Sequence, residues 1–95
     1  MSQLNLDELT KQELDFLFQK QSEAVKKANS ATNDDKLYLY KYYKQATVGN
    51  INIEEPGFFD FTGKAKYNAW KSVEDTSTTV SMKKYILKTN ELLKI

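Results

Sequence analysis

Apolar side chains recur at helical spacing in four stretches of the chain, and polar or breaker residues separate these stretches. The first runs from about residue 9 to residue 28, the second from about 34 to 48, and the third from about 62 to 73, while the fourth follows Ser77. Spacings of three and four residues place apolar side chains on one helix face. No alternating pattern of strand length competes, so we expect an all-α protein with four helices.

Residues that commonly begin helices precede the last three stretches. Asn33 or Asp34 is predicted to cap the second helix and Thr62 the third, because each side chain carries an oxygen that can accept from a free backbone N–H. The segment from Glu74 to Ser77 ends the third helix and supplies the cap of the fourth.

A long connection is predicted between the second and third helices. The second helix stops at Gly49, and residues 50–61 show no period and contain the breaker pair Pro56-Gly57. A dozen extended residues reach about 40 Å, whereas a helix of about 16 residues is about 24 Å long. The connection is therefore long enough to return along the second helix, which permits parallel second and third helices.

The composition limits the available chemistry. The chain has 95 residues, neither Cys nor His, and a net charge of +1. One small domain is expected, and a disulfide framework, a thiolate nucleophile, a zinc cluster and an imidazole base are excluded. The charge is too small for a duplex-DNA binder. The sequence shows no signal-peptide pattern and no bilayer-spanning run, so we expect a cytoplasmic protein without stable membrane insertion.

Two motifs combine aromatic rings with lysines. The first, YKYYKQATVGN, begins at Tyr40 and places Tyr40, Tyr43 and Lys44 on one helix face. The second, DFTGKAKYNAW, begins at Asp60. Rings beside fixed cations suit a ligand that has both a flat ring and a phosphate.

These two motifs, the EEPG turn between them and the Thr76-Ser77 start of the fourth helix resemble, in order and spacing, the acyl-CoA-binding protein family. The likeness needs no insertion or deletion from Leu37 to Ile95. It implies a four-helix up-down-down-up bundle forming a single domain over residues 1–95. Residues 1–12 are a candidate extension of the first helix, and the sequence also permits them to fold over the acyl tail or to stay mobile. The likeness also implies a monomeric carrier of long-chain acyl-CoA that performs no chemistry, needs no cofactor and serves acyl-CoA-using enzymes.

The resemblance assigns ligand contacts to seven residues. The groups that in the family hold the adenosine and its 3′-phosphate fall on Tyr40, Tyr43, Lys44, Lys66 and Tyr85. Leu37 matches a position that touches the acyl chain, and Lys26 matches a further cation near the phosphates.

Three positions depart from the family pattern. Glu55 stands before the Pro-Gly pair, where many members have Arg or Lys, so an auxiliary cation is absent there. Tyr67 stands where tryptophan is common, and Ser22 occupies a position that is usually apolar. These changes concern ligand preference and leave the five principal positions intact.

The same residues allow other interpretations. The tyrosine-lysine face is also suited to a phosphorylated or acidic partner protein, and stacked rings beside lysines suit single-stranded nucleic acid, although the near-neutral charge argues against nucleic acid. A flat face would favour a protein partner, and a groove leading to an apolar slot would favour acyl-CoA. Tyr85 lies on an apolar stripe, so a core role competes with a ligand contact. The pairs Asp34-Asp35 and Glu54-Glu55 are interpreted as cap and loop residues, not as a catalytic dyad.

Overall fold

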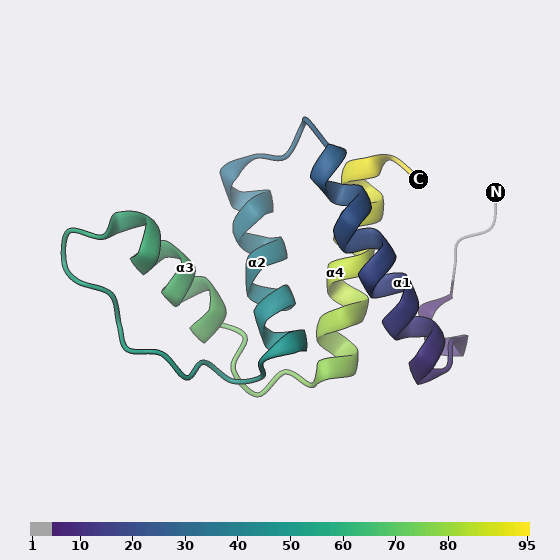
Figure 1. The fold of residues 1–95 in the computed structure, drawn as a ribbon, viewed down its shortest axis with the longest axis horizontal. Helices are drawn as coiled ribbons and strands as arrows, with labels where there is room; N and C mark the ends of the chain where they lie inside the picture. The colour runs from purple at the N-terminus through teal and green to yellow at the C-terminus, as the bar shows by residue number, and fades with distance from the viewer. Residues whose placement is uncertain (1–4) are drawn as a thin grey trace.

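The computed structural model describes residues 5–95, and these form four α-helices (Figure 1). The helices are α1 (Lys11–Ala24), α2 (Asn33–Thr47), α3 (Phe61–Lys71) and α4 (Thr78–Leu93). Two short 3₁₀ turns, η1 (Leu6–Glu8) and η2 (Val25–Lys27), flank α1. The described part of the chain contains no strand, and the predicted all-α class with four helices is confirmed.

The helices run up, down, down and up along the molecule (Figure 1). α4 packs against both α1 and α2, and α3 packs against the other side of α2. The connection between α2 and α3 passes around the outer side of α3 and rises to the start of that helix, so α2 and α3 run in the same direction (Figure 1). The predicted bundle and its long connection are therefore confirmed. The molecule measures 47 × 29 × 17 Å.

The cap of α2 is Thr32, so the prediction of Asn33 or Asp34 is wrong. The Thr32 hydroxyl accepts a hydrogen bond from the Asp35 N–H, and the Asp35 carboxylate accepts one from the Thr32 N–H. This reciprocal capping box satisfies two backbone donors at once, which neither Asn33 nor Asp34 achieves at its own position.

α3 is capped by Asp60, so the prediction of Thr62 is also wrong. The Asp60 carboxylate accepts from the Gly63 N–H at 3.0 Å, and its negative charge lies at the positive end of the helix. A Cβ on Gly63 would collide with that carboxylate, so glycine permits the close cap. The cap of α4 is Ser77, within the segment predicted to supply it, and its hydroxyl accepts from the Val80 N–H.

The residues before α1 do not lengthen that helix. Thr10 and Glu13 form a capping box that starts α1 at Lys11, and η1 is a separate turn. Leu6, within η1, is buried against the core. The candidate extension of the first helix is therefore wrong for residues 5–10, and residues 1–4 lie outside the described part of the chain.

The main core lies where α1, α2 and α4 meet. Its buried apolar side chains are Leu6, Leu14, Phe18, Ala46, Tyr85 and Ile86. The Phe18 and Ile86 side chains are completely excluded from solvent. α3 is attached separately, because the buried Trp70 donates its indole N–H to the Gly49 carbonyl at 2.9 Å. That bond ties α3 to the turn that ends α2.

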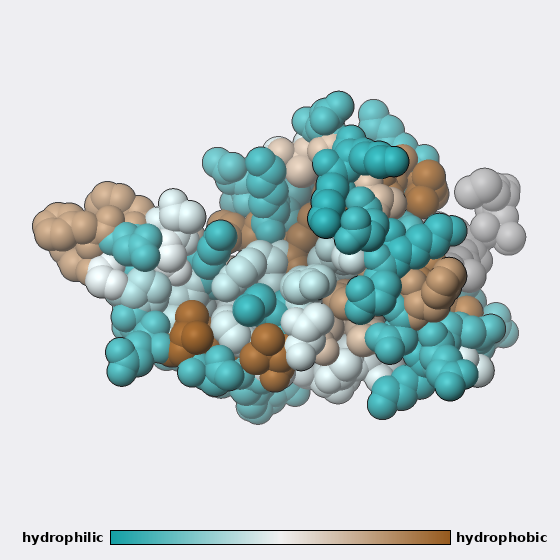
Figure 2. All heavy atoms as spheres, in the orientation of Figure 1, coloured by the Kyte–Doolittle hydropathy of each residue, from teal (hydrophilic) through white to brown (hydrophobic). Residues whose placement is uncertain are grey.

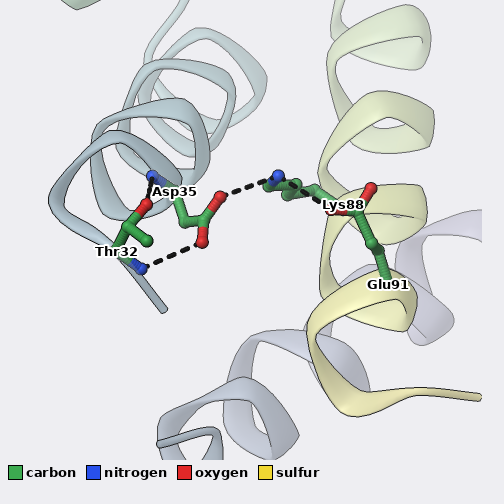
Figure 3. Close-up of polar contacts among 4 residues, drawn as sticks. All are labelled: Thr32, Asp35, Lys88 and Glu91. Carbon is green, nitrogen blue, oxygen red and sulfur yellow. Dashed lines mark hydrogen bonds and ion pairs between the residues drawn. The ribbon is translucent and has the colours of Figure 1, made fainter. Parts of the chain in front are cut away.

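An ion pair joins the first turn of α2 to α4 (Figure 3). The Lys88 ammonium lies 2.8 Å from the Asp35 carboxylate and 3.0 Å from that of Glu91. The hydrogen bond from Lys88, together with the Thr32 N–H, lowers the pKa of Asp35 to about 2, and the bond to Asp35 raises the pKa of Lys88. One carboxylate therefore starts α2 and holds it against α4.

Candidate functional site

A groove of about 290 Å³ lies between α1 and α2, with α4 behind it. The volume is near the lower end of the range for small-molecule sites. The groove exists because α1 and α2 both pack on α4 and diverge from each other around it. Its walls are formed by Ser22, Glu23, Val25, Lys26, Leu39, Tyr40, Tyr43 and Tyr85.

Three aromatic rings from three helices connect the core to this groove. The Phe18 ring stacks on Tyr43 with centroids 5.6 Å apart and packs against Tyr85 at 4.9 Å, while Tyr43 and Tyr85 lie 5.8 Å apart. Phe18 is fully buried behind the other two, and Tyr43 is 39% exposed. The fixed rings of Tyr43 and Tyr85 therefore present apolar surface and phenol groups to the groove.

Tyr85 belongs to both the core and the groove. It is 5% exposed, yet it lines the groove together with Tyr40 and Tyr43. Burial raises the pKa of Tyr85 to about 12, so the phenol is neutral at physiological pH and is able to donate a hydrogen bond. The two roles considered from the sequence are thus compatible at this residue.

Lys44 and Lys66, one from each aromatic motif, both lie where α2 packs against α3. The Lys66 ammonium lies 5.5 Å from the centre of the Tyr40 ring, and Tyr40 lines the groove. The Lys44 ammonium lies 5.0 Å from the centre of the Trp70 ring. Neither lysine lines the groove itself. Lys66 contacts Tyr40, which lines the groove, whereas Lys44 extends toward α3.

The remaining predicted positions have different outcomes. Lys26 lines the groove, but its ammonium is 3.2 Å from the Glu23 carboxylate, and both side chains are largely exposed. Leu37 is half-buried and is not among the residues that line the groove. The α2 wall instead includes Leu39, which packs against the core.

Four lining residues were not singled out as ligand contacts from the sequence: Ser22, Glu23, Val25 and Leu39. Ser22 and Val25 follow the buried Phe18 by four and seven residues, so helical spacing from Phe18 identifies them as the same face of the first helix. Glu23 and Leu39 carry no comparable signal. Glu23 lies beside that face of the first helix and Leu39 lies on the second helix, so each lines the groove only because the two helices diverge.

The groove lining offers binding groups but few reactive ones. Glu23 is its single carboxylate, and that carboxylate is paired with Lys26. Within residues 5–95, no group of three or more potential ligands is placed to hold a metal ion. Among the described residues, none of the helices has the length and apolar character needed to cross a membrane.

The fold and the groove together define a small helical ligand-binding domain. The sequence comparison identifies its kind: residues 15–89 match the family model for acyl-CoA-binding protein (ACBP). The chain belongs to the acyl-CoA-binding protein family. It is 50% identical over 64 residues to an acyl-CoA-binding protein of Ricinus communis, covering 67% of this chain and 71% of that relative.

Two further relatives agree with this assignment. An acyl-CoA-binding protein of Brassica napus is 47% identical over 77 residues, covering 80% of this chain and 84% of the relative. The crystal structure of an ACBP from Moniliophthora perniciosa superposes with a TM-score of 0.80 and 50% identity, covering 84% of this chain and 80% of that one. The family is thus shown by sequence and by fold.

Proposed function

We propose that this protein binds long-chain fatty acyl-CoA esters at the groove and acts as an intracellular, cytoplasmic acyl-CoA carrier and pool former. Family membership supports this function. The observation that carries the proposal is the position of Lys66 over the Tyr40 ring, because it places a cation for phosphate directly beside a largely apolar groove. An acyl-CoA has the same two parts.

The head group of the ligand is assigned to the aromatic and cationic side chains. Tyr40 and Tyr43 offer ring faces to adenine, and such stacking contributes about 1–3 kcal/mol per base in nucleic-acid complexes. Lys66 and Lys44, from α3 and α2, supply ammonium groups for the 3′-phosphate. The Tyr85 phenol donates a hydrogen bond to the ribose or the phosphate.

Lys26 is assigned a secondary role near the phosphates. Its pairing with Glu23 is exposed on both sides, and such surface pairs contribute about 0–1 kcal/mol. A polyanionic ligand therefore displaces Glu23 from Lys26 at little cost. The pair contributes charge at the edge of the groove, and its two exposed side chains do not close the groove.

The acyl chain is assigned to the apolar part of the groove. Val25 and Leu39 line it, whereas Leu37, one turn before Tyr40 on α2, lies outside the lining and would meet the acyl chain only beyond the groove. Each buried methylene contributes about 0.8 kcal/mol, so a chain of about 14 methylenes gains on the order of 11 kcal/mol before the costs of ordering and association. The head group then provides orientation and selectivity, and the tail provides much of the affinity.

A carrier of this kind works by binding and release. The protein shields the acyl chain from water, lowers the free acyl-CoA concentration and delivers the ligand to acyl-CoA-using enzymes by dissociation. We propose that it acts as a monomer, performs no turnover and needs neither a cofactor nor nucleic acid. The groove favours this function over a flat docking face for a phosphorylated or acidic protein partner.

Isothermal titration calorimetry with matched ligands tests the proposal. Palmitoyl-CoA should bind much more tightly than palmitate, which lacks the nucleotide, and more tightly than free coenzyme A, which lacks the tail. Equal affinities for palmitoyl-CoA and palmitate would show that the nucleotide contributes no affinity and would refute the head-group site. Native mass spectrometry of protein purified from cells should show co-purifying acyl-CoA masses.

Two lysine variants on α3 sharpen this test. Lys66 and Lys71 each place an ammonium over a tyrosine ring, at 5.5 Å from Tyr40 and 5.8 Å from Tyr67. Lys66→Ala should weaken palmitoyl-CoA binding about 10- to 100-fold, as expected for losing a charged hydrogen bond worth about 1.5–3 kcal/mol. Lys71→Ala should leave the affinity unchanged. Equal effects of the two variants would indicate bulk electrostatics in place of a site, and loss of helical circular dichroism would indicate a structural role for Lys66.

A further inference from the structure

Three phenylalanines at the junction of the long connection and α3 form an exposed aromatic tip. Phe58, Phe59 and Phe61 are 75%, 82% and 73% exposed, and the rings of Phe58 and Phe59 meet edge to face with centroids 5.1 Å apart. Figure 2 shows apolar atoms gathered at the left extremity of the molecule, where Figure 1 places this junction. A cluster of exposed apolar rings is typical of an interaction surface.

We propose that this phenylalanine tip, made of Phe58, Phe59 and Phe61, docks the protein reversibly on the interface of a zwitterionic lipid bilayer. Phenylalanine is among the side chains that membrane-surface segments bury at the boundary between acyl chains and head groups. The tip would enter that boundary while the remainder of the protein stays in water.

The size and shape of the tip favour a bilayer over a folded partner. Three such side chains expose roughly 350–550 Å², since one aromatic side chain presents about 150–250 Å² when fully exposed. A stable protein interface buries about 800 Å² on each partner. The junction that carries the tip also lies at one end of a molecule that is 47 Å long (Figure 1). A small convex surface fits a fluid lipid interface, whose molecules rearrange around it.

The charges beside the tip select a neutral lipid surface. Glu54, Glu55 and Asp60 precede or follow the phenylalanines, and Lys64 and Lys66 lie in the first turns of α3. The Lys64 ammonium is 3.2 Å from the Glu55 carboxylate, so part of this positive charge is already neutralised. Without an excess of positive charge, attraction to anionic lipids contributes little. Docking should therefore depend on ring insertion and change little with salt.

The same helix connects the tip to the candidate site. Phe61 begins α3 and Lys66 lies five residues later, about 7.5 Å along the helix axis. If the ligand is acyl-CoA, docking brings Lys66 close to the bilayer in which acyl chains partition, and the tip would speed ligand exchange with membranes. This link to exchange rests on the proposed function, whereas docking itself does not.

Fluorescence quenching by vesicles tests the docking directly. Phe59→Trp places an indole at the tip, and Phe16→Trp places one at a position of α1 that is 71% exposed, as a matched control. The native Trp70 is buried in both variants and gives the same background. With phosphatidylcholine vesicles carrying brominated acyl chains, F59W should be quenched at least threefold more than F16W, equally at low and high salt. Equal quenching of the two variants overturns the proposal.

Removal of the rings gives the second test. The double variant F58S/F59S should lose at least tenfold in binding to phosphatidylcholine vesicles by flotation, while F16S behaves as the wild-type protein. Both variants should bind palmitoyl-CoA within twofold of wild type by calorimetry, because the tip does not line the groove. The double variant should also extract palmitoyl-CoA from vesicles more slowly.

The remaining outcomes separate other occupants of the tip. A tenfold loss of palmitoyl-CoA affinity in F58S/F59S would mean that the rings cover the ligand, which overturns the proposal. A concentration-dependent dimer of the wild type that F58S/F59S abolishes would assign the tip to a second copy, with the same consequence. Quenching of F59W in a protein that fails to bind palmitoyl-CoA would support docking and refute the proposed function.

Discussion

Replacing Trp70 with Phe should destabilise the fold and weaken the attachment of α3. The Trp70 side chain is 1% exposed, donates to the Gly49 carbonyl at 2.9 Å and lies under the Lys44 ammonium at 5.0 Å. Phenylalanine removes the donor and leaves part of the indole volume empty. It also shrinks the ring that supports Lys44.

The expected loss follows from two separate contributions. Losing the hydrogen bond to Gly49 costs about 1 kcal/mol, because that carbonyl is partly buried. The volume left in a close-packed site costs about a further 1–2 kcal/mol, less than the 3–5 kcal/mol typical of Trp→Ala. A total of about 2–3 kcal/mol lowers the melting temperature by about 10–20 °C for a chain of this length.

Urea denaturation followed by circular dichroism measures this loss, and an isosteric analogue separates the two contributions. A synthetic chain with benzothienylalanine at position 70 replaces the indole N–H with sulfur and keeps the ring size. It should lose only the hydrogen-bond share, about 1 kcal/mol, and retain wild-type palmitoyl-CoA affinity. A Trp70→Phe protein as stable as wild type would refute the view that Trp70 attaches α3, and an analogue as unstable as Trp70→Phe would refute the volume contribution.

Three further predictions concern the groove, the ion pair and the amino-terminal turn. Tyr85→Phe should keep its unfolding free energy within about 1 kcal/mol and bind palmitoyl-CoA about 2- to 10-fold more weakly, since only a hydroxyl worth about 0.5–1.5 kcal/mol is removed; unchanged affinity in calorimetry would confine Tyr85 to the core. The depressed pKa of Asp35 means that its pairing stabilises the fold above pH about 4 and is lost as the pH falls toward about 2. Lys88→Met should therefore reduce the loss of stability in that pH interval. It should also return the pKa of Asp35, measured by NMR titration, toward its ordinary value; a pKa that stays at the wild-type value would contradict this. Leu6→Ser should cost about 2 kcal/mol because Leu6 is buried in the core cluster, whereas Leu87→Ser, at a position that is 56% exposed, should stay within about 0.5 kcal/mol in the same urea titration. Equal stability of these two variants would show that η1 is detached in solution.

The helices were predictable because their apolar spacing is strong, but their first residues were not. Thr32, Asn33 and Asp34 all carry side chains that cap helices, and the choice among them depends on Asp35 three residues after Thr32. The capping box is a sequence signature, so this error was avoidable. The separate turn around Leu6 was less accessible, because its burial depends on contact with residues distant in the sequence.

Buried polar contacts explain an irregularity in the fourth helix. Thr89 interrupts the apolar stripe of α4 yet is completely buried, and Gln21 of α1 donates to its hydroxyl and to the Asn90 side-chain oxygen. A polar residue on an apolar stripe predicts a buried partner. The sequence alone does not name that partner, because Gln21 is 68 residues away in the chain.

The site was only partly predictable for a related reason. Helical periodicity places Tyr40 and Tyr43 on one face, and the structure confirms that both line the groove. The contact of Lys66 with Tyr40 joins two helices through a long connection, and no local pattern contains it. The resemblance to a family named both residues as ligand contacts, but it did not predict their contact with each other. It also suggested Leu37, which the structure leaves outside the lining.

The tyrosines of α2 show why similar residues serve structure on one face and binding on another. Tyr38 and Tyr42 pack against each other with centroids 5.0 Å apart, and the Lys88 ammonium lies 5.4 Å from the Tyr38 ring. The Lys41 ammonium also lies 5.0 Å from the Tyr38 ring and 5.4 Å from the Tyr42 ring, but neither ring lines the groove. The Lys88 ammonium is already engaged by Asp35.

Lys66 differs from Lys88 in this respect. It faces the Tyr40 ring with its side chain exposed, and it forms no ion pair with any carboxylate in residues 5–95. A phosphate therefore gains the attraction of Lys66 without first breaking a half-buried ion pair. An aromatic-cation cluster functions as a binding site where the cation has no carboxylate partner and the ring borders a groove, and on α2 only the Tyr40 side of the described structure meets both conditions.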